Sequence, residues 1–304
     1  MFLERDPFLN ELQAARARAA AGQGCIVLVS GEAGIGKTTL VEQFASRVEQ
    51  EEGRARVLWG ACDALFTPRP LGPLLDMARQ AQGPLAELVR RGVDREILFT
   101  ALLDELSRAS TPTLAVFEDV HWADEATLDL LKFLARRIRR TPSLLVLTFR
   151  DDEVDGAHPL RRLLGEMPSA AVHRLRLPPL SQAAVARLAA AAGRAADELH
   201  DATGGNPFYV TEVLAMDAGG IPPSVRDAVL ARAARLDGAA SAVLDVVAIV
   251  PGRAERWLLE RMGNETPNAV EAGVGAGLLR ATREDVAFRH ELARRAWEDA
   301  LEPG

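Results

Sequence analysis

The chain has 304 residues, of which 48% are apolar, 26% charged and 5% aromatic, and its formal net charge is −7. This composition excludes a disordered chain, a collagen and a disulfide scaffold, and the length suits two domains or one domain with added subdomains. No apolar run reaches the roughly 18 residues of a membrane span, and the N-terminus is charged where a signal peptide is apolar, so we expect a cytoplasmic protein with no membrane partner.

Short apolar runs alternate with amphipathic stretches over the first 178 residues. After a helix expected at Glu11–Ala21, the runs of strand character are Cys25–Ser30, Ala55–Trp59, Leu114–Phe117, Leu144–Phe149 and Val172–Leu177. The helical patterns are Thr38–Glu51, Leu71–Gln80, Ile97–Ala109, Glu125–Arg139 and Pro159–Glu166. Continuous apolar strands that alternate with helices predict an α/β domain, with a parallel sheet covered by helices on both faces.

The strand pattern stops at Pro178 and Pro179. From Ser181 to Leu236 the sequence is helical and rich in alanine, with breaks at 204–207 and 219–223. The last part predicts helices at Ala240–Val250, Glu255–Met262 and Ala269–Ala276, a hairpin of Leu278–Arg280 with Val286–Phe288, and a helix at Glu291–Leu301. Three helices and a hairpin suggest a winged helix, so we expect domains at 1–178, 179–236 and 237–304.

A glycine-rich loop follows the first strand and precedes a helix, and it matches the pattern G-x-x-x-x-G-K-[ST]. Glycines let backbone N–H groups turn toward phosphates, and the following helix dipole favours an anion. Lys37 can reach the β- and γ-phosphate oxygens, and Thr38 can bind Mg²⁺. The alternative is a glycine-rich turn without a ligand. The residues expected at the nucleotide are Gly31, Gly34, Ile35, Gly36, Lys37, Thr38 and Thr39.

Two adjacent acids follow the strand Leu114–Phe117. At this place an NTPase with a phosphate loop needs a carboxylate on its Mg²⁺, and often a second acid that polarises water. Because neighbouring strand residues point to opposite sides, we expect Glu118 to bind the metal together with Thr38, and Asp119 to face the attacking water. The alternative is that one acid is functional and the other caps the next turn.

Arg150 directly follows the strand Leu144–Phe149, at the sheet edge where ligands of such sheets bind. It is therefore a candidate sensor of the γ-phosphate. The alternative is a loop arginine that pairs with Asp151 or Asp152.

Other residues have a structural interpretation beside a functional one. His121 and Trp122 either position a loop over the site or pack against it. The basic run at 132–140 is either a solvated helix face or an anion-binding patch. Residues in apolar runs without metal or redox spacing are expected in the core, namely Cys25, Cys62, Trp257 and Trp297.

Taken together, the motifs resemble those of a known ATPase family. In chain order they are the phosphate loop, FEDVHWAD at 117–124, TFR at 148–150, GGNPF at 204–208 and FRHE at 288–291. The set resembles the signal-transducing ATPases with numerous domains (STAND), and more narrowly the N-terminal ATPase module of the large ATP-binding regulators of the LuxR family. The resemblance extends over essentially the whole chain.

This resemblance implies an α/β P-loop NTPase sandwich of the AAA+/STAND type, followed by a helical lid and a winged helix, with nucleotide in the cleft where the three meet. It also implies site residues. Glu4, Arg5 and Pro207 would lie on the adenine and ribose side, Arg150 would sense the γ-phosphate, and His290 would touch the β-phosphate of ADP.

The implied function is an ATP/ADP switch in which ADP clamps the winged helix on the core, and ATP frees surfaces for self-association. Slow Mg²⁺-dependent hydrolysis would serve as a timer. The chain has Glu118 and Glu291 where aspartate is common in the family, which bears on Mg²⁺ geometry and hydrolysis rate. Full-length members also carry a sensor region and a LuxR-type DNA-binding domain, which we expect in a longer parent chain.

Two other functions fit parts of the sequence. An ATP-driven remodeller of the AAA+ type would need an arginine finger in trans, and arginine is abundant here. A DNA-binding protein would read sequence through its winged helix, but the region 255–276 holds Arg256 and Arg261 among acids. This is too little positive charge to neutralise phosphates, so direct nucleic-acid binding by this chain is not expected.

Overall fold

The structure is a computed structural model that describes residues 2–50, 56–65, 69–81, 83–108, 112–196, 198–216, 220–250 and 252–301. Four residues at the ends of predicted helices, strands and helix breaks lie outside the described residues, namely Glu51, Ala55, Ala109 and Gly219. The chain forms two compact units, which are described separately. The sheet unit consists of Arg5–Gly31 and Gly36–Leu177, and the helical unit of Met1–Glu4, Glu32–Ile35 and Pro178–Gly304.

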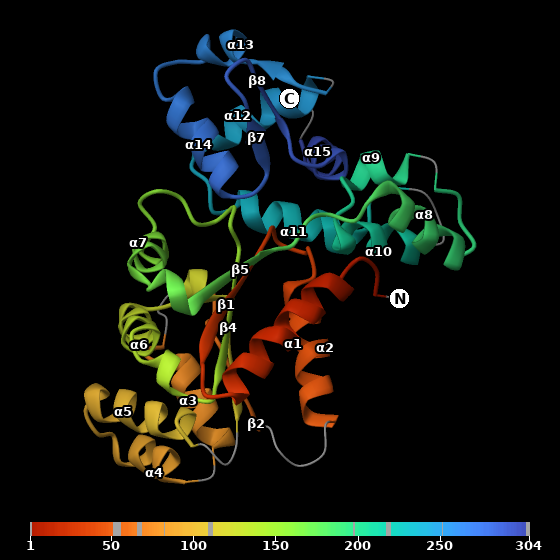
Figure 1. Ribbon diagram of the computed structural model, residues 1–304. Helices are drawn as coiled ribbons and strands as arrows, with labels where there is room; N and C mark the ends of the chain where they lie inside the picture. The colour runs from red at the N-terminus through yellow and green to blue at the C-terminus, as the bar shows by residue number, and fades with distance from the viewer. Residues whose placement is uncertain are drawn as a thin grey trace. The chain divides into compact units, whose positions relative to one another are not determined.

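A parallel sheet of five strands forms the centre of the sheet unit (Figure 1). The strands are β1 (Cys25–Ser30), β2 (Arg56–Ala61), β3 (Thr113–Glu118), β4 (Leu144–Phe149) and β5 (Val172–Arg176). They lie in the order β2-β3-β4-β1-β5, and every pair is parallel, so the predicted α/β class is confirmed. Because β3, β4 and β1 are neighbours, the segments that follow these three strands lie beside one another at the carboxyl edge of the sheet.

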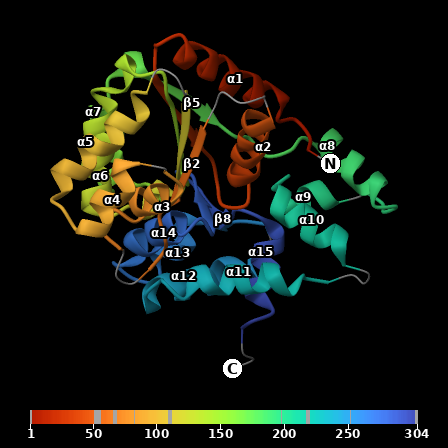
Figure 2. The same ribbon diagram turned by 90° about the horizontal axis from the view of Figure 1, so that it is seen from below.

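Helices cover both faces of this sheet. Figure 2 shows α1 and α2 on one face and α3 to α7 on the other. The helices are α1 (Asp6–Ala20), α2 (Lys37–Gln50), α3 (Gly72–Gln80), α4 (Pro84–Arg91), α5 (Arg95–Leu106), α6 (Glu125–Ala135) and α7 (Pro159–Glu166). Short 3₁₀ helices span Val120–Trp122, Ile138–Arg140 and Ser169–Ala171.

In the sheet unit, the largest differences from the sequence predictions concern the bounds of two helices and the presence of a third. α1 begins at Asp6 and not at Glu11, because Pro7 stands in its first turn, where a helix tolerates proline. α4 was not predicted; it is a short helix that starts at Pro84. α6 ends at Ala135, and the rest of the expected helix is the 3₁₀ turn that ends at Arg140.

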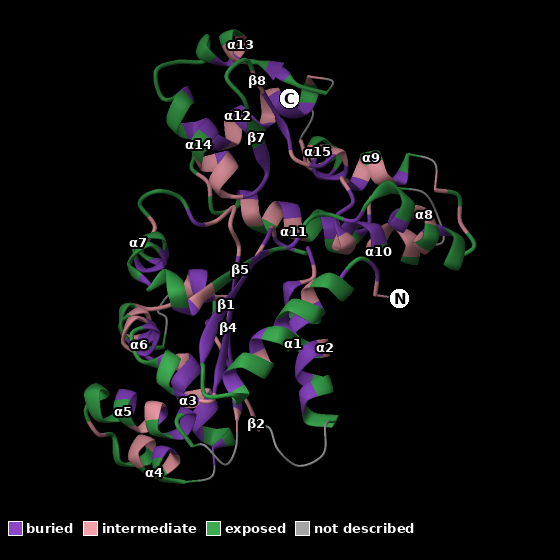
Figure 3. Cartoon of the chain, in the orientation of Figure 1, coloured by how far each residue is buried: buried purple, intermediate pink, exposed green. Residues whose placement is uncertain are grey.

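The central strands β1, β3 and β4 are buried on both faces, as Figure 3 shows for β1 and β4, while the edge strands β2 and β5 are partly exposed. Cys25 and Cys62 are buried free thiols, which confirms their place in the core. Burial raises the pKa of Cys62 to about 12, so this thiol stays protonated and inert. The arginines of the basic run are exposed, as expected of a solvated helix face; they are Arg136, Arg137, Arg139 and Arg140.

The helical unit contains eight helices and a small antiparallel sheet among its described residues. The helices are α8 (Gln182–Ala191), α9 (Leu199–Thr203), α10 (Pro207–Ala215), α11 (Pro223–Ala233), α12 (Gly238–Ile249), α13 (Arg256–Glu260), α14 (Thr266–Gly275) and α15 (Glu291–Glu298). The sheet has the order β6-β8-β7, built from β6 (Ala254–Glu255), β7 (Leu279–Ala281) and β8 (Asp285–Phe288). β7 and β8 form the expected hairpin, and β6 adds a third strand that the sequence did not indicate.

The two tryptophans of this unit have different surroundings. Trp297 packs against the apolar core, and its indole N–H donates to Asp245 at 2.9 Å. Trp257 is 58% exposed, so its predicted place in the core is wrong. It lies on α13, a helix of five residues whose one buried residue is Leu259, and its indole N–H donates to Glu255. In the part of the chain that the structure describes, no helix is long and apolar enough to cross a membrane.

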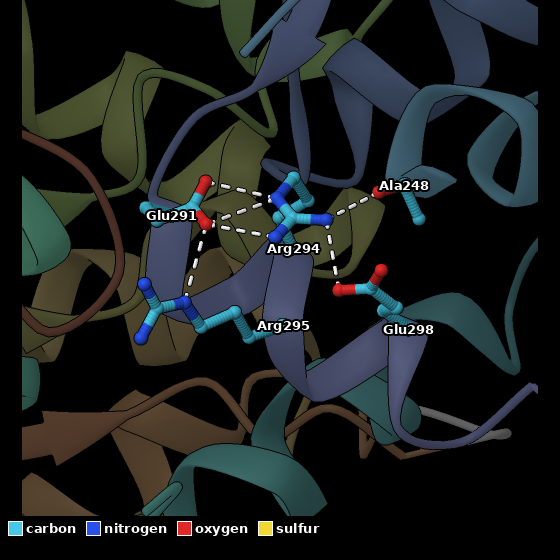
Figure 4. Close-up of polar contacts among 5 residues, drawn as sticks. All are labelled: Ala248, Glu291, Arg294, Arg295 and Glu298. Carbon is cyan, nitrogen blue, oxygen red and sulfur yellow. Dashed lines mark hydrogen bonds and ion pairs between the residues drawn. The ribbon is translucent and has the colours of Figure 1, made fainter. Parts of the chain in front are cut away.

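Arginine contacts hold the last helix in place (Figure 4). Arg294 binds both carboxylate oxygens of Glu291 and one of Glu298, and it donates to the carbonyl of Ala248 at the end of α12. Arg295 adds a hydrogen bond of 3.2 Å to Glu291. The hydrogen bond from Arg294 is the main reason that the pKa of Glu291 is lowered. Glu291 therefore holds Arg294 from within α15, and the bond from Arg294 to Ala248 joins this helix to α12.

Candidate functional site

The loop after β1 has the backbone of an anion cradle. Gly34 and Gly36 have φ angles of +80° and +94°, which glycine adopts without strain. A Cβ atom at Gly36 would meet no heavy atom within 4 Å, so space is open beside the loop. Helix α2 begins at Lys37, and the N–H groups of a helix's first turn have no partner within the helix. The loop and the helix start therefore offer N–H donors to an anion.

Lys37 is buried at the start of α2, with 6% of its surface exposed. Its ammonium donates to the carbonyl of Gly31 at 2.9 Å. Burial lowers the pKa of Lys37, the carboxylate of Asp119 acts in the opposite direction, and Arg150 lowers it further. An anion bound by the N–H donors of this loop would lie beside the buried ammonium of Lys37. Its opposite charge would stabilise the charged form of the lysine.

Thr38 and Glu118 meet although they come from different elements. The Thr38 hydroxyl, on the first turn of α2, donates to a carboxylate oxygen of Glu118 at the end of β3. The other carboxylate oxygen accepts from the Trp59 indole at 3.1 Å. A hydroxyl and a carboxylate are oxygen ligands of the kind that Mg²⁺ takes. The described residues contain no group of three or more His, Cys, Asp or Glu placed to hold a metal, so a cation here would complete its shell with phosphate and water oxygens.

Asp119 lies just beyond β3 in a left-handed backbone conformation, with φ +51° and ψ +45°. Its N–H donates to the Thr148 hydroxyl at 2.9 Å, which fixes the turn. Burial raises the pKa of Asp119, and the charges of Arg150 and Lys37 oppose this effect. The backbone turn, and not the strand alternation that we expected, separates Asp119 from Glu118, because β3 ends at Glu118.

Arg150 is ion-paired with Glu153, which the sequence did not indicate as its partner. Asp151 instead accepts from Arg176 at 2.8 Å. The guanidinium carbon of Arg150 lies 4.6 Å from the centre of the Trp122 ring, which places an aromatic face under the cation.

His121 packs inside this carboxyl edge, with its side chain fully buried. Its ring lies 4.4 Å from that of Trp122, and its two nitrogens lie 3.8 Å from Asp119 and 3.7 Å from Glu153. His121 therefore packs between Asp119 and Glu153, the ion-pair partner of Arg150. The packing interpretation of the His121–Trp122 pair is confirmed, since the two rings lie 4.4 Å apart. A role in positioning a loop over the site stays a prediction.

Sequence reasoning did not single out three residues of this site, namely Trp59, Thr148 and Glu153. Trp59 meets Glu118 because β2 lies beside β3, and Thr148 meets Asp119 because β4 does. The order of the strands decides both contacts. The motif TFR at 148–150 carried a signal for Thr148, but only as a neighbour of Arg150.

In the helical unit, the loop residues 32–35 contact the segment that opens α10. The Asn206 side chain donates to Glu32 at 2.7 Å and to the carbonyl of Ala33 at 3.0 Å. The N–H of Phe208 donates to the carbonyl of Gly34 at 3.2 Å. Pro207 is the first residue of α10, between these two partners of the loop.

His290 lies two residues after the end of β8, at the N-cap of α15, and is 6% exposed. Its Nε2 is 3.4 Å from the Glu32 carboxylate, and its ring packs against Tyr209 at 4.8 Å. Gly204 has a φ of +58°, and a Cβ there would lie 2.7 Å from Nδ1 of His290. Within the helical unit, His290 therefore lies beside Glu32 of the loop residues 32–35.

Arg5 and Glu4 were expected on the adenine side together with Pro207. Arg5 is 2% exposed in the sheet unit, just before α1. Glu4 accepts from the N–H of Ser181 at 2.9 Å in the helical unit. An adenine contact of these residues stays a prediction.

Comparisons with known proteins agree with this geometry. Residues 1–147 match the family model described as "AAA ATPase domain". An uncharacterised protein of Rhizobium meliloti (strain 1021) is 28% identical over 253 residues, and the match covers 64% of this chain and 23% of that protein. The chain therefore spans less than a quarter of the length of the curated relative that it matches.

Solved structures share the fold over almost the whole chain. A Walker-type ATPase of Pyrococcus abyssi has a TM-score of 0.69 at 12% identity, covering 98% of this chain and 96% of that one. The ORC2 protein of Aeropyrum pernix, in ADPNP-ADP complexes, has a TM-score of 0.63 at 15% identity, covering 98% and 95%. Cdc6p of Pyrobaculum aerophilum has a TM-score of 0.54 at 15% identity, covering 99% and 96%. Residues 1–147 are thus similar to an AAA ATPase domain, and the parallel sheet of five strands with its phosphate loop is the α/β fold of a P-loop NTPase.

Proposed function

We propose that the chain binds ATP and ADP with Mg²⁺ and acts as a switch with slow ATP hydrolysis, in a transcriptional regulator of the LuxR-family type. The observation that carries the nucleotide proposal is the contact between Thr38 and Glu118 beside the buried ammonium of Lys37. A cation, an N–H-lined loop and a pair of oxygen ligands meet at the carboxyl edge of the sheet. That combination suits a polyphosphate with its metal.

In this proposal each residue has a separate task. Lys37 holds the β- and γ-phosphates, and Thr38 and Glu118 hold Mg²⁺, which neutralises phosphate charge when it is bound. Asp119 orients the attacking water and accepts its proton, from a position that the Thr148 hydroxyl fixes. The raised pKa of Asp119 makes it a stronger base than an exposed aspartate.

Slow hydrolysis follows from the surroundings of Arg150. A γ-phosphate sensor must turn its guanidinium to the phosphate, yet Arg150 is paired with Glu153 and lies over Trp122. Exchanging one ion pair for another gives little net stabilisation, so we infer a sensor that distinguishes ATP from ADP weakly and supports a low turnover.

We propose that residues 179–236 form a helical lid and residues 237–304 a winged helix. The order of α12, α13 and α14 followed by the hairpin β7–β8 supports the winged helix. As in the resembling family, His290 would touch the β-phosphate of ADP, and Arg5 and Pro207 would lie on the adenine and ribose side. ADP would then hold the winged helix on the core, and ATP would permit self-association. Sensor and DNA-binding domains belong, in this proposal, to a longer parent chain.

The test is to denature the purified protein, identify the released nucleotide by chromatography, and titrate nucleotide-free protein with ATP and ADP in a calorimeter, with and without Mg²⁺. Bound adenine nucleotide and an ATP affinity that depends on Mg²⁺ are expected. Absence of binding to both nucleotides would overturn the proposal. ADP binding without any change in elution volume between ADP and ATP would overturn only the switch.

A further inference from the structure

The proposed function leaves Glu32 without a task. Glu32 is the first residue after Gly31 in the phosphate loop, and a carboxylate in an anion-binding loop repels phosphate unless its charge is neutralised or turned away. Its side chain is 13% exposed, so it is not simply directed into solvent.

Three polar side chains surround the Glu32 carboxylate. The Asn206 amide donates to Oε1 at 2.7 Å, His290 Nε2 lies 3.4 Å from Oε2, and Arg289 lies 3.6 Å from the same oxygen. Burial alone would raise the pKa of Glu32, but the hydrogen bonds from His290 and Asn206 and the charges of His290 and Arg289 lower it. Glu32 is therefore ionised, and its charge is compensated within the helical unit.

The same neighbours hold the backbone that follows Glu32. Asn206 also donates to the carbonyl of Ala33, and the N–H of Phe208 donates to the carbonyl of Gly34. A Cβ at Gly34 would lie 2.7 Å from Phe208, which shows how closely the two segments approach. The carbonyls of Ala33 and Gly34 thus face Asn206 and Phe208, while the space beside Gly36 is open.

We propose that Glu32 is a positioning residue of the nucleotide site. Its carboxylate, bound by Asn206, Arg289 and His290, holds the phosphate loop in the conformation that leaves the space beside Gly36 open. This inference rests on the proposed nucleotide binding for its functional consequence, but the ordering of the loop can be measured without nucleotide. The two ideas can therefore fail separately.

The sign of the Glu32→Gln effect distinguishes positioning from simple repulsion. If Glu32 acted only through its negative charge, removing that charge would tighten ADP binding. If Glu32 positions the loop, Glu32→Gln weakens the contacts with Arg289 and His290, which depend on its charge. The ADP affinity should then fall by roughly tenfold, the effect of one charge-assisted hydrogen bond. Glu42→Gln is the matched control, because Glu42 lies exposed on α2 and the substitution removes the same charge.

The first measurement is hydrogen exchange of the peptide that covers residues 31–38, in protein without nucleotide. We expect faster exchange in Glu32→Gln and wild-type exchange in Glu42→Gln. Equal exchange in the wild type and Glu32→Gln would overturn the positioning role.

The second measurement is a double-mutant cycle of ADP affinity with Glu32→Gln and His290→Gln. If His290 acts on the loop through Glu32 as well as on the phosphate, the double variant loses less ADP affinity than the sum of the two single losses. Fully additive losses would overturn the link between the two residues, as would tighter binding by Glu32→Gln. If the wild type binds no ADP, the proposed function is overturned. If Glu32→Gln then still shows faster exchange of the loop, Glu32 remains the residue that orders the loop.

Discussion

The hydroxyl of Thr38 donates to the carboxylate of Glu118 across a separation of 80 residues. The contact joins the first turn of α2 to the end of β3, next to the buried ammonium of Lys37. A divalent metal bound by both groups would replace this hydrogen bond with two coordination bonds. The first two predictions follow from this contact and from the acid beside it.

Glu118→Gln is expected to remove most of the Mg²⁺ dependence of ATP binding. The amide keeps an oxygen that can accept from Thr38 or Trp59, but it lacks the negative charge that a hard cation requires. ATP affinity measured in EDTA should match that of the wild type, and the gain on adding Mg²⁺ should shrink by roughly tenfold, equal to about 1.4 kcal/mol. An unchanged gain would show that Glu118 is not a metal ligand.

Asp119→Asn is expected to keep Mg²⁺-dependent ATP binding and to lose turnover. Asparagine adopts the left-handed backbone of this position readily, so the turn and its bond to Thr148 should survive. Loss of the proton acceptor lowers the hydrolysis rate by roughly a hundredfold or more. The check is single-turnover hydrolysis at saturating ATP. A defect identical to that of Glu118→Gln would contradict the division of roles.

Lys37→Ala is expected to reduce ADP affinity by roughly ten- to a hundredfold, the effect of one charge-assisted bond. Because burial disfavours the charged ammonium of Lys37, the variant should melt no lower than the wild type in the absence of nucleotide. Lys132→Ala is the control: Lys132 is the only other lysine and pairs with Glu166 on the surface. Calorimetric titration of both variants checks the prediction, which fails if they bind ADP equally well.

His290→Ala is expected to lower the melting temperature and, in addition, to reduce the stabilisation that ADP gives. The first effect reflects lost packing against Tyr209, and the second reflects loss of the proposed β-phosphate contact and of the contact with Glu32. His158→Ala supplies the comparison, because His158 caps α7 and its loss should destabilise the protein without touching the site. Thermal shifts with and without saturating ADP decide the matter. An undiminished ADP shift in His290→Ala would make the histidine structural.

Glu32 gives the stability a dependence on pH. Its folded pKa is held below its ordinary value of 4.5, so its contacts stabilise the folded state above that value, and this stabilisation is lost as the pH falls through the folded pKa. The difference in unfolding free energy between the wild type and Glu32→Gln should therefore shrink as the pH falls below 4.5. Urea unfolding at several pH values measures it. A difference that grows in acid would contradict the lowered pKa.

The sequence allowed the five strands, the phosphate loop and the pairing of Thr38 with Glu118 to be predicted, because each depends on local pattern or on the rule that parallel strands end at one edge. It could not show that Trp59 and Thr148 contact the two acids, since those contacts depend on strand order. The left-handed turn at Asp119 was also hidden, because aspartate gives a weak signal for that backbone.

Helices were predicted well where their apolar residues repeat over many turns. α4 was not predicted because it is short. Trp257 was wrongly predicted in the core, because apolar spacing does not show which faces of a five-residue helix pack against other elements. The neighbours of Glu32 come from positions 206, 289 and 290, and no spacing rule connects such distant positions.

Gly204 and His290 restrict each other. The left-handed backbone of Gly204 and the 2.7 Å that a Cβ would leave to the imidazole mean that neither position can be replaced independently by a larger residue. Among homologous chains the two positions should therefore vary in concert: a side chain at 204 should occur with a small residue at 290, and histidine at 290 only with glycine at 204. Such covariation would be a record, in natural sequences, of how tightly this histidine is packed.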